Sequence, residues 1–230
     1  MSGLGYLYWK QVLSTLRDII PVYDKVNRVI SLGKDDYYRY LGISENVKAG
    51  DLVLDAGSGF GNMSLMTQKI TANDIKIIMY DPLLEMLQNS REYVTVESLS
   101  CGIFENIPFK DNSFDIVMCG YSLRDAINLE IAISEIHRIL KKGGIFIIVD
   151  LGKPDNKIIR LGVTIYLKYI LNIFAYVIAG ENGLKFKALY GTYTKWPNNQ
   201  MLYSLLKKNF SNIKYIKKMM GGSIIVSSIK

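Results

Sequence analysis

Short, almost wholly apolar runs alternate with helix-like periodicity through the middle of the chain. The runs cover residues 52–55, 76–80, 93–96 or slightly later, 114–119 and 145–149. Between the last two runs, residues 129–140 repeat apolar positions at the spacing of one helix face. Strands apolar enough to be buried on both faces, alternating with helices, predict an α/β fold with a Rossmann-like, doubly wound, mostly parallel sheet.

Two segments read as helical without belonging to this alternation. Residues 1–45 form a helical leader, in which Leu13 and Leu16 share one helix face. Residues 158–179 form a long apolar stretch that one arginine and one lysine interrupt. These charges argue against a membrane-spanning helix but leave open a helix that lies on a surface.

The end of the chain predicts a further helix and a hairpin. Residues 201–208 read as the helix, and residues 213–217 and 223–229 as strands joined by Met-Met-Gly-Gly. This antiparallel hairpin brings the expected sheet to about seven strands in one domain. We divide that domain into a leader (1–45), a core (46–152), a helical insertion (153–200) and a C-terminal helix with its hairpin (201–230).

Composition narrows the class of protein. The 230 residues are 49% hydrophobic, which suits one domain with a real core, and the net charge is +7. Such a charge favours an anionic partner or simply a lysine-rich surface. We expect no nucleic-acid partner, because the basic residues do not cluster with stacking aromatics. Two cysteines without a CxxC pair predict no metal site, and the lack of a secretory signal favours the cytoplasm.

A glycine-rich loop follows the first strand. The strand ends at Asp55, Gly57, Gly59 and Gly61 alternate after it, and a helix begins at Asn62. Glycines allow a sharp turn and a close approach to a ligand, and the helix start offers unpaired N–H groups. A dinucleotide fingerprint requires a glycine at position 62, and the P-loop signature is absent. Leu-Asp followed by Gly-x-Gly-x-Gly is typical of S-adenosylmethionine-dependent methyltransferases, although a plain tight turn is the alternative.

Asp81 closes the second strand at the place where an acidic residue meets ribose hydroxyls. One carboxylate accepts two hydroxyl hydrogen bonds at once. Asp81 also suits the start of a helix with Pro82 in its first position, and the two roles are compatible.

Six stretches form one series along nearly the whole chain. They are Tyr23-Asp24-Lys25-Val26-Asn27, the loop 51–61, Glu105-Asn106-Ile107-Pro108-Phe109 continuing to 115, Tyr121-Ser122-Leu123-Arg124-Asp125, residues 135–144 and Asp150-Leu151-Gly152-Lys153-Pro154. In this order they resemble the C-methyltransferases of ubiquinone and menaquinone biosynthesis. The first stretch and the Leu-Arg element are the specific ones, whereas the Leu-Lys-Lys-Gly-Gly turn is common to many methyltransferases.

The resemblance implies a class I methyltransferase fold with S-adenosylmethionine as cofactor. The implied cofactor contacts are Asp55, Gly57, Gly59, Phe60, Gly61, Asp81, Pro82, Ile103, Phe104 and Gly120. The chain departs from the family pattern at Ile103 and Phe104, where the family has Asp or Asn followed by Ala. The adenine is then expected to meet a backbone group. Phe60 in place of Thr and Asp125 in place of Asn leave the exact methyl acceptor open.

The resemblance also implies a chemistry, methylation of a ring carbon in a prenylated quinol. Such a carbon becomes nucleophilic when a neighbouring phenol loses its proton. Arg124 is expected to hold the phenolate charge and Asp125 to take the proton, directly or through water, while Tyr23 orients the ring or the donor. The alternatives are a structural Arg124–Asp125 ion pair and a Tyr23 that packs a lid. His137, the only histidine, reads as a surface or packing residue.

A prenylated substrate suggests a function for the apolar stretch 158–179. With Lys153, Lys157, Arg160 and Lys168 it fits an anionic membrane surface, which places the enzyme in the cytoplasm, peripheral at the inner face of the membrane. A homodimer face or a plain cover over the sheet is the alternative. Other open hypotheses are a methyltransferase of another small lipid or phenolic metabolite, and a non-catalytic cofactor-binding protein.

Overall fold

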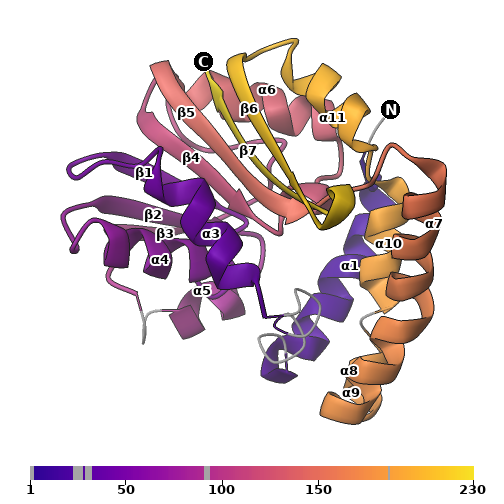
Figure 1. The fold of residues 1–230 in the computed structure, drawn as a ribbon. Coiled ribbons are helices and arrows are strands. Elements are labelled where there is room, and N and C mark those ends of the chain that lie inside the picture. Colours follow the sequence, from indigo (N-terminus) through magenta and orange to yellow (C-terminus); the bar gives the residue numbers. More distant parts are fainter. Residues whose placement is uncertain (1–2, 23–27, 29–32, 91–93, 186) are drawn as a thin grey trace.

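A seven-stranded sheet forms the centre of the protein (Figure 1). The computed structural model describes residues 3–22, 28, 33–90, 94–185 and 187–230. The strands are β1 (Leu52–Ala56), β2 (Lys76–Asp81), β3 (Ser98–Cys101), β4 (Phe114–Gly120), β5 (Leu140–Leu151), β6 (Ser211–Lys218) and β7 (Ser223–Ile229). Their order is β3-β2-β1-β4-β5-β7-β6; the first five are parallel, and β7 is antiparallel to both neighbours. The predicted sheet and terminal hairpin are confirmed.

The central strands are apolar on both sides because each side has its own core. In β4, Val117 packs into one hydrophobic cluster and Ile116 and Met118 into the other, and Phe146 and Ile147 of β5 divide in the same way. Successive side chains of a strand point to opposite faces, so continuous apolar runs require covers on both.

Helices cover the two faces of the sheet. On one face lie α3 (Asp35–Ser44), α4 (Asn62–Ile70) and α5 (Leu84–Ser90); on the other lie α6 (Leu129–Ile139) and α11 (Asn199–Leu206) (Figure 1). This arrangement leaves the carboxyl ends of β1, β2 and β4 at a common edge, where ligands of doubly wound folds bind.

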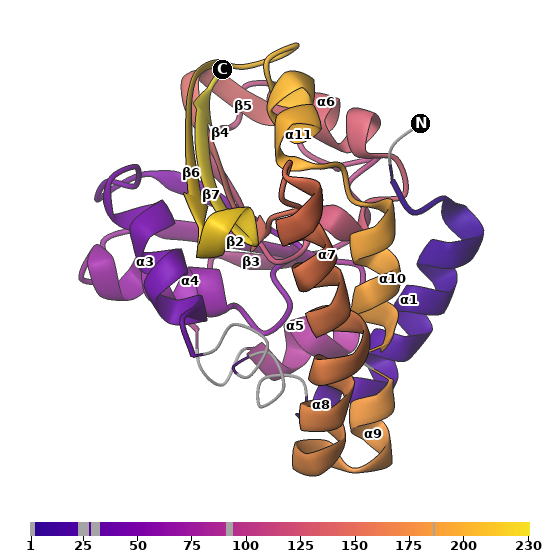
Figure 2. The same cartoon turned by 45° about the vertical axis from the view of Figure 1, so that its right-hand side comes forward.

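The remaining helices form a group beyond that edge. Its members are α1 (Tyr6–Ile19), α7 (Lys157–Ile165), a π-helical turn (Tyr166–Ile170), α8 (Leu171–Ala179), α9 (Glu181–Leu184) and α10 (Lys187–Lys195). Figure 2 shows α7, α10 and α1 side by side. Ile19 of the leader shares a small core with Leu167, Leu171 and Tyr193 of the insertion. Leader and insertion therefore form one helical cover.

Two boundaries differ from the sequence-based expectation. The third strand begins at Ser98, after the expected 93–96, and α6 ends at Ile139. Leu140 is already extended (φ −68°, ψ 141°) and pairs with Phe114, so the Lys-Lys-Gly-Gly segment belongs to an irregular start of β5. The pairing with β4 shifts register there, and Gly143 supplies a positive φ of 77°.

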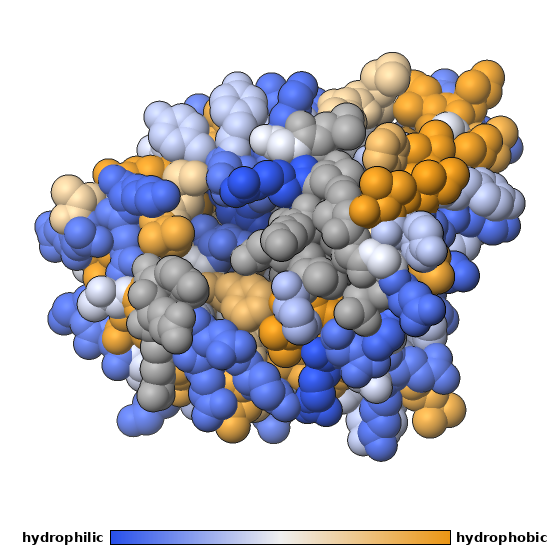
Figure 3. All heavy atoms as spheres, turned by 90° about the horizontal axis from the view of Figure 1, so that it is seen from below, coloured by the Kyte–Doolittle hydropathy of each residue, from blue (hydrophilic) through white to orange (hydrophobic). Residues whose placement is uncertain are grey.

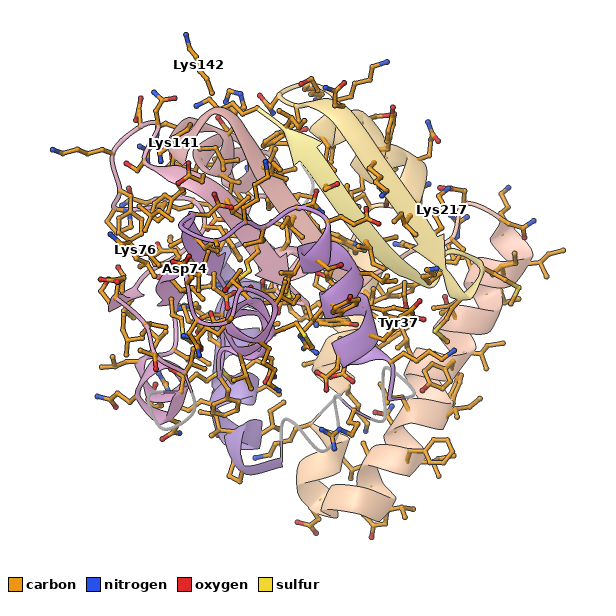
Figure 4. All side chains as sticks on the ribbon, turned by 60° about the vertical axis from the view of Figure 1, so that its left-hand side comes forward. Tyr37, Asp74, Lys76, Lys141, Lys142 and Lys217 are labelled. Atoms are coloured by element: carbon orange, nitrogen blue, oxygen red, sulfur yellow. The ribbon has the colours of Figure 1, made fainter. Side chains whose placement is uncertain are left out.

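The basic residues labelled in Figure 4 are distributed over separate strands. Lys141 and Lys142 lie at the start of β5, Lys76 at the start of β2 and Lys217 on β6. The starts of the parallel strands are at the opposite edge of the sheet from the strand ends that carry the glycine loop. Lys76, Lys141 and Lys142 therefore do not supply positive charge to that loop. Lys217 lies near the end of β6, four strands away from β1, and pairs with Asp155 at 2.9 Å.

Candidate active site

The glycine loop is held by its backbone. Gly57, Gly59 and Gly61 have φ of 69°, 54° and 84°, in the left-handed region. The N–H groups of Gly57 and Ser58 donate to the Tyr80 carbonyl at 2.7 and 3.1 Å, which ties the loop to the end of β2. A Cβ at position 57 would stand 2.4 Å from the Cβ of Ser122. Only glycine satisfies both the turn and this close approach.

Asp81 is fixed by two backbone hydrogen bonds. Its Oδ2 accepts from the Gly59 N–H at 2.9 Å and its Oδ1 from the Leu83 N–H at 2.8 Å, at the entry to α5. Burial raises the pKa of Asp81 to about 6, although the two hydrogen bonds oppose the shift. A carboxylate offers about four lone-pair sites, so acceptor capacity remains for a ligand. The expected ribose contact and the helix-start role are therefore geometrically compatible.

Asp55 and Gly61 support the loop from behind. Asp55 is fully buried, and its Oδ2 accepts from the N–H and Oγ of Ser64 at 3.1 and 2.6 Å, which anchors the first turn of α4. Gly61 stands at the N-cap of that helix. Neither residue lines the cavity described below, and their direct contact with a cofactor stays a prediction. Each shapes the loop that lines the cavity.

The strand ends and α1 enclose a cavity of about 930 Å³, open mouth included. It is lined by these expected site residues: Gly57, Gly59, Phe60, Asp81, Pro82, Ile103, Phe104, Gly120 and Asp125. We call residues 57–60 with Asp81 and Pro82 the loop wall.

The opposite side of the cavity was not foreseen from the sequence. Trp9, Val12, Leu13 and Leu16 of α1 line it, and we call these four residues the helix wall. The leader showed the apolar spacing of Leu13 and Leu16, but nothing local indicated that this helix faces the glycine loop. Two hydrogen bonds join it to the segment after β4, from the Leu4 N–H to the Ala126 carbonyl (2.9 Å) and from the Gly5 N–H to the Ile127 carbonyl (3.0 Å).

At the Ile103 end of the cavity, the backbone carbonyl is already engaged. It accepts from the Tyr80 hydroxyl at 2.7 Å and from the Asn106 N–H at 3.2 Å. A carbonyl has two lone pairs, so this oxygen is a poor acceptor for an additional amine. The carboxylate of Glu105 lines the same end. A backbone contact to adenine therefore needs a group other than the Ile103 oxygen.

Arg124 and Asp125 differ in their ion pairs and in their contact with the cavity. Arg124 is nearly buried, and its Nη1 donates to Oδ1 of the fully buried Asp150, while its Nε lies 3.9 Å from Oδ1 of Asp125. Asp125 lines the cavity and Arg124 does not. Burial raises the pKa of Asp125 to about 6, with the positive charge of Arg124 opposing the shift. Arg124 is thus placed to act through Asp125, and its expected direct contact with a substrate stays a prediction.

Two other candidates lie elsewhere. Tyr23, expected to orient the ring or the donor, is outside the described residues. His137 is on α6, with its ring 5.4 Å from that of Phe210 in an edge-on packing, and it is not part of the cavity lining. This location agrees with the packing role expected for His137.

Comparisons with known proteins now identify the family. The model of the ubiE/COQ5 methyltransferase family matches residues 7–230. The chain belongs to this family. It is 31% identical over 229 residues to the demethylmenaquinone methyltransferase of Lactobacillus johnsonii, covering 96% of this chain and 93% of that protein. It is 32% identical over 163 residues to the demethylmenaquinone methyltransferase of Symbiobacterium thermophilum, covering 68% of this chain and 65% of that protein.

Solved structures of more distant proteins share the fold. The chain aligns with an S-adenosylmethionine-dependent methyltransferase from Thermotoga maritima with a TM-score of 0.56 and 20% identity, covering 94% of this chain and 99% of that one. A methyltransferase in a complex with the Haloferax volcanii Trm112 activator aligns with a TM-score of 0.61 and 16% identity, over 89% and 95% of the two chains. The protein therefore has the class I methyltransferase fold.

The family uses S-adenosylmethionine, and the residues of this chain fit that cofactor. The loop wall forms a cradle that a Cβ at Gly57 would obstruct. Asp81 retains acceptor capacity for hydroxyl groups. The Ser58 hydroxyl oxygen is buried without a hydrogen-bond partner in the part of the chain that the structure describes, and Ser58 lines the cavity. These polar groups can therefore form hydrogen bonds with a ligand bound in the cavity.

Proposed function

We propose that this methyltransferase transfers a methyl group to a ring carbon of a prenylated quinol. The observation that carries the proposal is one cavity with two contrasting walls: a polar loop wall suited to the cofactor and an apolar helix wall facing it. Prenylated quinols are largely apolar, and the two relatives described above are demethylmenaquinone methyltransferases. An apolar wall favours such a substrate through the burial of its surface.

S-adenosylmethionine, when bound, supplies an electrophilic methyl group on sulfur. Asp125 takes the proton of the quinol hydroxyl, directly or through one water, which makes the neighbouring ring carbon electron-rich. After this carbon has accepted the methyl group, it releases its own hydrogen as a proton to water, and the ring becomes aromatic again. With a pKa of about 6 it is mostly ionised at neutral pH yet basic enough to accept a proton. Arg124 restrains that pKa and holds Asp125 in place. The helix wall excludes water from the nucleophile.

Methyl incorporation tests this function. The enzyme is incubated with methyl-labelled S-adenosylmethionine and a demethylated menaquinol with a short prenyl chain, kept reduced by dithionite. A matched acceptor carries the same ring without the prenyl chain. We expect a ring-methylated product, with the prenylated acceptor showing a KM lower by about tenfold or more because its chain is buried. A parallel incubation contains a cell lipid extract in place of the defined acceptors. Label that enters only another lipid or phenol there, with none in the menaquinol, would refute the quinol assignment.

The helical cover carries an apolar surface that extends this proposal to the membrane. Ile158, Leu161, Ile173 and Val177 are exposed on α7 and α8. Figure 3 shows apolar surface gathered on the right-hand side of the view from below, where α7 to α9 lie in Figure 1. Among the described residues, Lys157–Val177 is the one helix long and apolar enough to cross a membrane, with 17% of its most apolar window buried. A single helix of this kind is weak evidence for a span.

We propose that this surface, which we call the apolar flank, rests on the anionic inner face of the membrane. Lys157 and Lys168 are exposed beside it, and Lys168 stands 5.1 Å from the Tyr169 ring. Cations and aromatics around an apolar stripe are characteristic of interfacial helices. The proposal includes a cytoplasmic, peripheral location for the enzyme, in which a prenylated substrate in the membrane is accessible.

Flotation with vesicles tests the membrane contact. We expect the enzyme to float with vesicles containing phosphatidylglycerol more than with purely zwitterionic ones, and to lose this binding in Ile173→Asp/Val177→Asp. Met201→Asp, at an exposed position of α11, is the matched control. If the double variant floats as the wild type does, the flank is not the contact. If it instead converts a dimer into a monomer in light scattering, the flank is a homodimer face.

A further inference from the structure

Arg39 of α3 is the only cationic side chain that lines the cavity within the described ranges. Its side chain is only 6% exposed, and its Nη1 is paired with Asp35 Oδ2 at 2.8 Å. Its Nε is buried and has no hydrogen-bond partner among the described residues. A buried donor without a partner is costly, and a ligand that accepts a hydrogen bond from it would remove this cost. Nothing in the leader's sequence pattern singled out this residue.

A strained residue positions the guanidinium. Tyr121 directly follows β4 and has a φ of 61°, in the left-handed region that a bulky side chain rarely adopts. Its N–H donates to the Val149 carbonyl at 2.7 Å, which holds this conformation. The Tyr121 ring lies 5.0 Å from the Arg39 guanidinium carbon, within cation–π distance. Such strain is concentrated at ligand sites because the surrounding structure has to maintain it.

The order of the strands shows which part of the cofactor lies near Arg39. Asp81, suited to the ribose, ends β2, whose neighbours in the sheet are β3 and β1. Ile103 and Phe104 follow β3 and line the cavity, and they are the residues expected to lie beside the adenine. The rest of an elongated ligand must then cross the β1 loop towards the end of β4, where Tyr121 and Arg39 stand. In S-adenosylmethionine that remaining part is the methionine moiety, which ends in a carboxylate.

We propose that Arg39 binds the carboxylate of the methionine moiety of S-adenosylmethionine. Asp35 holds Nη1, so the edge of the guanidinium that carries Nε faces the ligand. This edge presents two parallel N–H donors, which match the two oxygens of a carboxylate. Tyr121 supports the flat face of the same group. The inference rests on the cofactor that the family uses, and it stands or falls independently of the quinol acceptor.

Calorimetry with two ligands tests this contact without any turnover. S-adenosylmethionine and its decarboxylated form differ only in the carboxylate. We expect the wild type to bind the complete cofactor roughly 10- to 100-fold more tightly, the range of a hydrogen bond to a charged group. Arg39→Met should weaken the complete cofactor by a similar factor and leave the decarboxylated form within about threefold. Equal weakening of both ligands, or a wild type that does not discriminate, would overturn the proposal.

Two further variants keep the test decisive. Arg17→Met removes an arginine of α1 whose Nε pairs with Glu85 at 2.9 Å outside the cavity, and it should change neither affinity. If Arg39→Met does not fold, Arg39→Lys replaces it, since lysine retains a charge for Asp35 but lacks the two-donor edge. Arg39→Lys should then lose most of the discrimination. Unchanged cofactor affinities with a raised KM for the acceptor would place Arg39 on the acceptor instead.

Discussion

The loop wall and the helix wall of the cavity are built in different ways. In the loop wall, the backbone provides most of the structure: two glycines with positive φ, N–H groups that donate to the Tyr80 carbonyl, and a carboxylate held by two further N–H groups. In the helix wall, four apolar side chains of α1 line the cavity, whereas the backbone groups of α1 take part in the helix itself.

This difference separates the tasks of the two walls. A backbone wall tolerates few substitutions, because each hydrogen bond and each positive φ is tied to one conformation. A side-chain wall accepts other apolar residues of similar volume with a small loss. The first suits a cofactor that does not change, and the second suits a substrate that differs among enzymes of one fold. Four predictions test this division, from the largest expected effect to the smallest.

Asp125, which also lines the cavity, should control the rate rather than cofactor binding. In Asp125→Asn we expect kcat to fall by about 100- to 10,000-fold because a general base is lost, with the Kd of S-adenosylmethionine changed by less than about threefold. The wild-type rate should fall as the pH drops below about 6, where the carboxylate becomes protonated. Steady-state kinetics against pH and calorimetry measure both. A variant with normal kcat would exclude Asp125 as the base.

The loop wall should not tolerate a single methyl group. Gly57→Ala adds a Cβ that collides with Ser122 and also requires a φ of 69°, so we expect cofactor affinity to fall by at least about 100-fold. Gly50→Ala is the control, because its φ of 84° is equally strained while a Cβ there meets nothing within 4 Å. Calorimetry and thermal unfolding compare the two. Equal losses in both variants would attribute the effect to backbone strain alone.

The buried carboxylate of the loop wall should make the ligand-free protein less stable as the pH rises. The pKa of Asp81 is about 6 in the folded protein and about 3.9 in an unfolded chain. Between these values the unfolded state loses its proton first, so the free energy of unfolding falls from about pH 4 to about pH 6. Asp81→Asn lacks this contribution. Its stability relative to the wild type should rise by about 1–3 kcal/mol over that range, as measured by urea unfolding. If the difference in the free energy of unfolding between the two proteins stays constant over this pH range, the pKa of Asp81 is not raised in the folded protein.

The helix wall should affect the acceptor and only slightly the cofactor. In Trp9→Ala we expect the KM of a prenylated quinol to rise about five- to twentyfold through lost apolar contact, with the Kd of S-adenosylmethionine within about twofold. Leu7→Ala, at a position of the same helix that is 79% exposed, is the control and should change neither. If Trp9→Ala weakens the cofactor as strongly as the acceptor, the two walls do not divide their tasks as described.

The parts of the molecule that were predictable from the sequence are those governed by local geometry. The strands that carry the site were placed by their apolar runs, and the loop by the spacing of Gly57, Gly59 and Gly61. Asp81 was recognised because it closes a strand at a fixed place after that loop. In each case the residue type is required by the local backbone conformation, and the neighbouring residues in the sequence indicate that conformation.

The remaining features depend on contacts between distant segments. Arg124 was linked to its sequence neighbour Asp125, whereas its main partner is Asp150 at the end of the adjacent strand. Arg39 meets Tyr121 only because α3 packs beside the end of β4. The adenine was expected to meet a backbone group, and the Ile103 carbonyl already accepts a hydrogen bond from the Tyr80 hydroxyl. Such pairings arise from tertiary packing and leave no periodic trace in the sequence.

The antiparallel pairing of β5 with β7 has a consequence for how the protein can diverge. Leu151 pairs with Ser223, so α7 to α11 and β6 lie in a segment whose two ends are fixed side by side in the sheet. Lengthening such a segment adds little entropy cost, since the cost grows only with the logarithm of its length. We therefore expect this segment to tolerate insertions in its connections while the strand pairing and the cofactor loop are retained.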